Sequence, residues 1–278
     1  MALLGSEAVK EPLTSRLLFP LTERRFTYRH YDRWLARLDP ARVVPLRELA
    51  GAQPPAVGLR HDVDDRLESA VAFARLEHAR GIRATYFVLH TAPYYRHDER
   101  FAATLRMLQD ELGHEIGWHN DLLTLEHFEG VDTASYLAAE LAWLRDVGID
   151  VRGTAAHGSP HCHRLGYHNN YVFSGWDERQ PGFPAVHVRR KLDPSVFGLE
   201  YEAYHLPYDV YVSDSSFERG KRIDPTTFDL GALGASQRAV VLVHACHWDR
   251  SSAAKLRRLA RKVTRRVRAR AGRLRSPR

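Results

Sequence analysis

Carboxylates follow the first strongly apolar segment of the chain. Residues 60–65 read RHDVDD and come directly after the apolar residues that open this segment. Because side chains alternate along a strand, Asp62 and Asp64 should share one face while Val63 points to the other. A carboxylate placed directly after a buried strand is costly unless it is paired or bound to a metal. Asp65 is explained equally well as a cap of the following helix.

Three further segments with strand character end in histidine. His119 ends the string GHEIGWH, and His157 and His244 follow two other β-rich runs. One such histidine is more often structural than functional, but the joint pattern on separate strand ends is harder to reach by chance. Imidazole and carboxylate groups together are ligands suited to zinc or another divalent transition metal.

Strand-like and helix-like segments alternate along the chain and would position these side chains. The strand candidates are residues 56–62, 82–90, 114–119, 151–157, 208–213 and 239–244, and helical apolar stripes lie between several of them. This alternation indicates a parallel sheet with helices outside. No Gly-x-Gly-x-x-Gly motif follows the first strand, so the pattern favours an incomplete β/α barrel over a dinucleotide-binding sheet. In such a barrel, catalytic groups lie at the carboxyl ends of the strands.

The order of these motifs resembles one known family. The segments are LRHDVD at 59–64, ATYFV at 84–88, GHEIGWH at 113–119 and VLVH at 241–244. Over roughly residues 55–250 the chain is similar to NodB-homology polysaccharide deacetylases (carbohydrate esterase family 4), and closest to a divergent His-Asp-Val-Asp subgroup. The resemblance implies an α/β fold, a distorted (β/α)7 barrel. It also implies a metal-dependent hydrolase that removes an acetyl group from an amino sugar or glycan by attack of metal-bound water, with Zn²⁺ as the expected metal.

The resemblance assigns roles to the first acidic residues and to the late histidine. Asp62 matches the general base and Asp64 the first metal ligand, although Val63 separates two residues that are adjacent in the family. The reverse assignment of the two aspartates stays open. His244 matches the late histidine that acts as general acid, and His119 matches the first metal-ligating histidine.

The resemblance does not assign the third metal ligand to one residue. The family's second histidine would fall four residues after His119, where this chain has Leu123. Asp121 and His157 are the candidates to replace it. Alternatively, His157 takes the place of the arginine that orients the base in the family.

Polar and aromatic residues beside these motifs are candidates for substrate binding. Two interpretations are open for each type of residue. An aromatic ring at these positions would stack on a sugar or pack in the core, and an acidic residue would contact the substrate or hold a histidine in place. The candidates are Trp118, Asn120, Asp214, His247 and Trp248.

Length and charge divide the chain into three parts. We expect an N-terminal helix and lead-in at 1–54, the barrel at 55–250 and a basic amphipathic C-terminal helix at 251–278. Residues 255–278 hold 12 of the 41 Lys and Arg residues and no acidic residue, so the remaining 29 basic and 34 acidic residues give the body a net charge of −5. The tail therefore predicts docking at an anionic membrane surface. Nucleic-acid binding is not expected, because no recognition motif accompanies the charge.

No apolar run approaches the ~18 residues of a membrane span, and no signal peptide is visible. We therefore expect a cytoplasmic protein, peripheral at the inner membrane face. The split aspartates and Leu123 keep open a catalytically inactive barrel that binds a glycan. Hydrolysis of a non-sugar amide is a further alternative.

Overall fold

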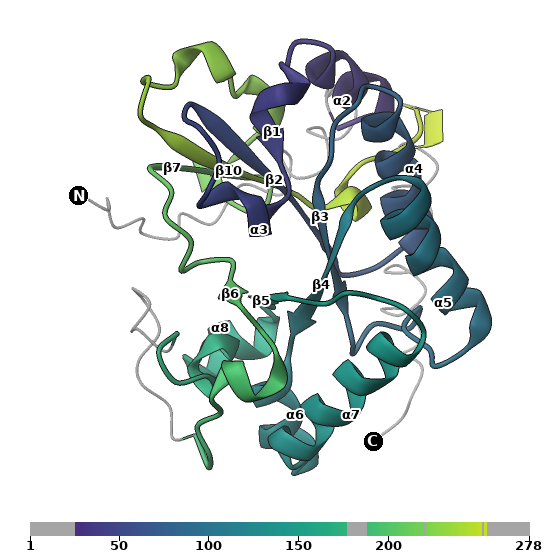
Figure 1. Cartoon of the computed structure of the whole chain (residues 1–278), viewed down its shortest axis with the longest axis vertical. Helices are drawn as coiled ribbons and strands as arrows, with labels where there is room; N and C mark the ends of the chain where they lie inside the picture. Colours follow the sequence, from purple (N-terminus) through teal and green to yellow (C-terminus); the bar gives the residue numbers. More distant parts are fainter. Residues whose placement is uncertain (1–25, 177–187, 219–220, 252, 255–278) are drawn as a thin grey trace, which may run out of the picture.

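The computed structural model describes residues 26–176, 188–218, 221–251 and 253–254. Its centre is a parallel sheet that curls into a half-barrel, in an α/β fold (Figure 1). The strand order is β6-β5-β4-β3-β2-β10-β7, and β1 pairs with the beginning of β2. The strands of this sheet are β1 (Val43–Val44), β2 (Ala56–Val63), β3 (Thr85–Leu89), β4 (Glu115–Asn120), β5 (Gly153–Ala156), β6 (Tyr201–Glu202), β7 (Val210–Ser213) and β10 (Arg238–Val243).

The predicted parallel α/β arrangement is confirmed, and every strand pair in this sheet is parallel. The central strands are buried along their whole length, as expected for strands covered on both faces. The described strands form an open path that ends at β6 and β7, so a complete seven-stranded barrel is not established. A separate antiparallel pair, β8 (Phe217–Glu218) with β9 (Lys221–Arg222), lies outside the sheet.

Helices cover the outer face of the curled sheet, with α4, α5 and α7 on one side of it (Figure 1). Side-chain caps fix where several of them begin: Thr27, Asp98 and Asp132 each accept a hydrogen bond from a backbone N–H in the first turn. The helices are α2 (Tyr28–Leu35), α3 (Leu46–Leu49), α4 (Leu67–His78), α5 (Glu99–Arg106), α6 (Leu122–Glu129), α7 (Thr133–Asp146) and α8 (Pro160–Leu165). No helix of the described residues is long and apolar enough to cross a membrane.

Two apolar cores lie on opposite faces of the sheet. The larger one packs the sheet against the outer helices and includes the apolar stripes of α4, α5 and α7. The smaller one fills the inside of the curl, where Phe87 and Tyr201 lie with Leu46 of α3. Gly117, the register partner of Phe87, makes room for that ring, because a Cβ there would lie 2.4 Å from two of its atoms. The interior below the carboxyl ends of the strands is therefore packed with side chains.

A buried polar network joins β2 to α4 on the outer face. His61 lies 2.7 Å from Glu77 through its Nε2 atom, and its Nδ1 atom lies 3.0 Å from the carbonyl oxygen of Val243. Tyr31 and Tyr86 donate their hydroxyl protons to the same Glu77 carboxylate. These contacts hold His61 away from the inner face, so the residues on either side of it in β2 point inward.

Candidate active site

The predicted site residues lie at the carboxyl ends of neighbouring parallel strands. Asp62 lies near the end of β2 and His119 near the end of β4. His157, Asp214 and His244 directly follow β5, β7 and β10, respectively. Because the strands are parallel, all these ends meet at one edge of the half-barrel. The topology thus gathers side chains that are up to 182 positions apart in the sequence.

Asp62 is held by an arginine from its own strand. Arg60 donates from Nε to Asp62 Oδ1 at 2.7 Å and from Nη2 to Asp62 Oδ2 at 2.8 Å, a bidentate ion pair with both residues buried. The guanidinium lies between the rings of Phe87 and Tyr204, 5.4 and 4.8 Å from their centroids. Burial alone would raise the pKa of Asp62, but Arg60 and the nearby His119 hold it well below its usual range. Asp62 is therefore ionised at neutral pH.

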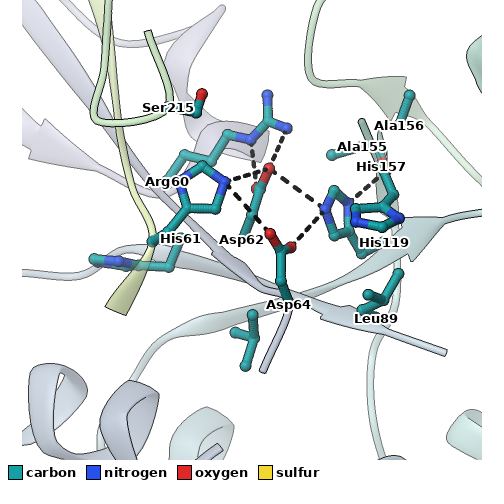
Figure 2. Close-up of polar contacts among 12 residues, drawn as sticks. Arg60, His61, Asp62, Asp64, Leu89, His119, Ala155, Ala156, His157 and Ser215 are labelled. Carbon is teal, nitrogen blue, oxygen red and sulfur yellow. Dashed lines mark hydrogen bonds and ion pairs between the residues drawn. The ribbon is translucent and has the colours of Figure 1, made fainter. Parts of the chain in front are cut away.

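His119 presents its second nitrogen to both aspartates (Figure 2). Its Nδ1 atom lies 2.8 Å from the carbonyl oxygen of Ala155 and donates to it, which leaves Nε2 to face the two carboxylates. The Nε2 atom lies 3.5 Å from Asp62 Oδ2 and 3.3 Å from Asp64 Oδ1. Asp64 Oδ1 is buried and makes no hydrogen bond among the described residues. A ring nitrogen that faces two carboxylates calls for a proton or a metal cation among them.

The spacing of these atoms fits a zinc ion. Two ligand atoms bound to zinc at about 2.0–2.1 Å with tetrahedral angles lie about 3.3 Å apart. His119 Nε2 and Asp64 Oδ1 are separated by 3.3 Å. A ligating histidine commonly donates its other N–H to a backbone carbonyl, as His119 does to Ala155. This single distance is compatible with two zinc ligands, whereas the group of three donor atoms that the described residues bring within 4.8 Å of one another is Asp214, His244 and His247.

His157 lies beside His119, with ring centroids 5.2 Å apart. Its Nδ1 atom is 3.3 Å from Asp121 Oδ2, an ion-pair contact. Burial would lower the pKa of His157, but Asp121 and Asp64 raise it above the usual value. The structure thus brings His157 next to His119, where the sequence left the third ligand open.

Asp121 is already surrounded by donors. Thr124 donates to its Oδ1 atom at 2.6 Å, Asn169 donates to the same atom at 3.0 Å, and Thr91 donates to Oδ2 at 3.2 Å. Together with His157, these contacts occupy both carboxylate oxygens. Asp121 is thus placed to anchor His157 and the start of α6. The choice between Asp121 and His157 as the third ligand stays a prediction.

His244 is tethered through Asp214 and faces the two aspartates. Its Nδ1 atom lies 2.6 Å from Asp214 Oδ1, and its Nε2 atom lies 3.9 Å from Asp62 Oδ2 and 3.8 Å from Asp64 Oδ2. Burial would lower the pKa of His244, but the Asp214 carboxylate, with the two other aspartates, raises it to about 9. His244 is therefore protonated at neutral pH, with one N–H directed toward Asp62 and Asp64.

Asp214, His244 and His247 form a second cluster of donor atoms. One ligand atom from each lies within 4.8 Å of the others, a spacing that a metal ion could use. His247 Nδ1 is 3.3 Å from Asp214 Oδ2, and Trp248 donates from Nε1 to the same oxygen at 3.1 Å. The Asp214 carboxylate thus contacts His244, His247 and Trp248, as expected for a carboxylate that orients histidine rings.

Several predicted substrate contacts are buried in the structure. Trp118 stacks on His90 with centroids 4.4 Å apart, and Trp248 packs in the outer core. Asn120 donates to the carbonyl of Asn169 and accepts from the backbone of Leu122. Trp118, Asn120 and Trp248 are each 0% exposed, and their role as substrate contacts stays a prediction. Of the predicted substrate contacts, His247 is partly exposed and stays a candidate.

Sequence reasoning missed Arg60. The alternation that places Asp62 and Asp64 on one face also places Arg60 on that face, two residues earlier. An arginine inside an apolar strand needs a buried partner, and that requirement was the available signal.

No family model matches this chain, and no curated protein matches it.

Proposed function

We propose that the protein is a metal-dependent hydrolase that removes an acetyl group from an amino sugar or glycan, within a barrel of the NodB type. The observation that carries the proposal is the arrangement around two carboxylates. Asp62 is held ionised by Arg60, while Asp64 faces the Nε2 atoms of two histidines, His119 and His244. These groups separate the roles of base, ligand and acid that acyl hydrolysis requires.

Asp64, His119 and His157 are the residues that would hold the metal. Asp64 and His119 have the ligand spacing, and His157 lies next to His119. A zinc ion bound there would supply a Lewis acid and lower the pKa of a water molecule to about 7. The carboxylate of Asp64 is partly open to solvent, with 29% of its side chain exposed, which leaves access for a substrate.

Asp62 would accept the proton of the attacking water. Its two hydrogen bonds to Arg60 fix the orientation of the carboxylate and keep it ionised. The same ion pair lowers the basicity of Asp62, so the residue holds and orients the water as well as accepting its proton. Arg60 thereby supplies the arginine that orients the base in the family, and His157 is left for the metal.

His244 would act as the general acid. Its raised pKa, about 9, keeps it protonated at neutral pH, and Asp214 fixes the ring through Nδ1. The proton on Nε2 is then available to the departing amine. A positioned acid of this kind contributes about 10²–10⁴-fold to the rate.

An inactive barrel that binds a glycan is the second candidate. The observation in its favour is Leu123, which occupies the place of the family's second histidine and is buried. If His157 does not replace that histidine, the chain has two ligands where three are needed.

Acetate release tests the proposed function. Zinc-loaded protein would be incubated with a panel of N-acetylated amino sugars and their oligomers, and free acetate would be measured. The expected result is acetate release that Asp62→Asn reduces by at least about 10²-fold. Sugar binding without acetate release by the wild-type protein favours the inactive barrel. Acetate release from simple acetamides but not from sugars favours the non-sugar amidase.

A further inference from the structure

A cavity of about 590 Å³ lies between α4 and α5, outside the candidate active site. Its walls come from α4, from the loop between β3 and α5, from α5 and from the segment after β10. Leu67, Val71 and Phe101 give it an apolar floor. This volume suits a small-molecule ligand.

The cavity is rich in arginine. Arg75, Arg96, Arg100 and Arg250 line it together with two acidic residues. All four arginines are exposed to solvent. Their contacts are weak: Arg75 contacts the sulfur of Met107 at 3.2 Å and Arg96 the carbonyl oxygen of Pro93 at 3.4 Å. Within the described part of the chain, none of these four arginines forms an ion pair.

The two acidic residues do not cancel this charge. Asp98 is committed to capping α5, where its Oδ1 atom accepts the N–H of Phe101 at 2.8 Å. Glu68 lies in the first turn of α4 and is exposed.

The cavity is joined to the active-site strand by Tyr94. This residue lines the cavity, accepts a hydrogen bond from the backbone of Leu89 at 2.8 Å, and donates its hydroxyl proton to the carbonyl of Val63. Val63 stands between Asp62 and Asp64 in the sequence. The Tyr94 hydroxyl therefore connects the wall of the cavity to the strand end that carries both aspartates, although neither aspartate lines the cavity.

We propose that this cavity binds the phosphate or diphosphate group of an activated sugar. Several arginines that make no ion pair with a described residue match the charge and geometry of phosphate oxygens, which guanidinium groups bind through paired hydrogen bonds. The apolar floor accommodates the ring or chain attached to the phosphate. The sugar part of this inference rests on the proposed deacylase function, whereas the phosphate part does not.

Calorimetric titration with inorganic pyrophosphate tests the phosphate part. The cavity variant is Arg96→Gln/Arg100→Gln, and the control is Arg29→Gln/Arg33→Gln, which removes two exposed arginines from α2 and changes the net charge equally. We expect the cavity variant to bind pyrophosphate at least about tenfold more weakly than wild type, since each charge-assisted hydrogen bond is individually worth about that factor. The control should keep the wild-type affinity. Absence of pyrophosphate binding by the wild type, or equal affinities of the two variants, would overturn the proposal.

Two further titrations identify the source of the phosphate. Weaker binding of uridine diphosphate by the cavity variant than by the control supports a nucleotide-linked sugar. Weaker binding to vesicles of phosphatidylcholine and phosphatidylglycerol supports a lipid-linked one. Pyrophosphate binding needs neither a metal nor turnover, so failure of the deacylase proposal leaves this result intact. Conversely, acetate release would still stand if pyrophosphate did not bind.

Discussion

Replacing Arg60 by methionine should destabilise the protein through Asp62. Both side chains are almost fully buried, at 0% and 4% exposure, and they share two hydrogen bonds of 2.7 and 2.8 Å. Removing one partner of a buried ion pair costs about 3–5 kcal/mol, because a charge is left uncompensated. His119, 3.5 Å from Asp62, still faces the carboxylate, so we expect the lower end, about 3 kcal/mol.

Urea unfolding of the metal-free protein at neutral pH measures this cost. Arg83→Met is the matched control, because Arg83 forms a bidentate pair with Glu48 at 2.6 Å that is largely exposed to solvent. An exposed pair of this kind contributes about 1 kcal/mol or less. The double variant Arg60→Met/Asp62→Asn removes both buried charges and should be more stable than Arg60→Met alone. If Arg60→Met costs no more than Arg83→Met, the buried pair does not constrain Asp62 and the reasoning is refuted.

The pH dependence of this contribution has a defined sign. The pKa of Asp62 in the folded protein lies below its ordinary value of 3.8, so the stabilisation is fully present above that value. It is lost as the pH falls below 3.8 toward the folded-state pKa. The contribution of Asp62 to the stability of the wild type, measured by urea unfolding, should therefore be constant from neutral pH down to about pH 5 and shrink under more acidic conditions.

Three further predictions concern the acid, the two aspartates and the tail. Asp214→Asn should lower the pKa of His244 from about 9 toward 6.5 in an NMR titration of metal-free protein, and an unchanged value would remove Asp214 as the cause. Asp62→Asn should keep bound metal but lose most turnover, whereas Asp64→Asn should lose the metal. Elemental analysis and acetate assays measure the two effects, and the opposite pattern would reverse the roles of the two aspartates. Deleting residues 255–278, which lie outside the described residues, takes the net charge from +7 to −5. The deletion should preserve turnover of soluble substrates and weaken binding to anionic vesicles by about 1 kcal/mol per basic residue near the surface. Vesicle binding that survives the deletion argues against a membrane role for the tail.

The short strands β1 and β6, of two residues each, were not predicted, whereas the longer strands of the sheet were predictable from β-rich runs in the sequence. The segment at 239–244, for example, contains five apolar residues in succession, and β10 occupies Arg238–Val243. Parallel strands place their carboxyl ends at one edge, so the neighbourhood of His119, His157 and His244 also followed from the pattern. Helix α6 (Leu122–Glu129) was not predicted, because Asp121 gives it no side-chain capping hydrogen bond and its apolar residues are not confined to one stripe.

Partners within the site were harder to predict than positions. The contact of Asp214 with His244 depends on β7 lying next to β10, and nothing in a single sequence states which strands are neighbours. The burial of Trp118 depends on its stacking against His90 from the adjacent strand region. The pairing of Arg60 with Asp62 is the exception, since two residues on the same face of one strand can be read from alternation.

Zinc titration of the metal-stripped protein tests the central claim most directly, because the proposed centre and a second group of residues could each hold a metal ion. The predicted centre includes His119, and the alternative cluster consists of Asp214, His244 and His247. The account predicts about one zinc ion per wild-type chain, loss of that binding in His119→Ala and its retention in His247→Ala, since a site held by three protein ligands cannot spare one. Retention of zinc by His119→Ala together with its loss in His247→Ala would contradict the account and place the metal beside Asp214.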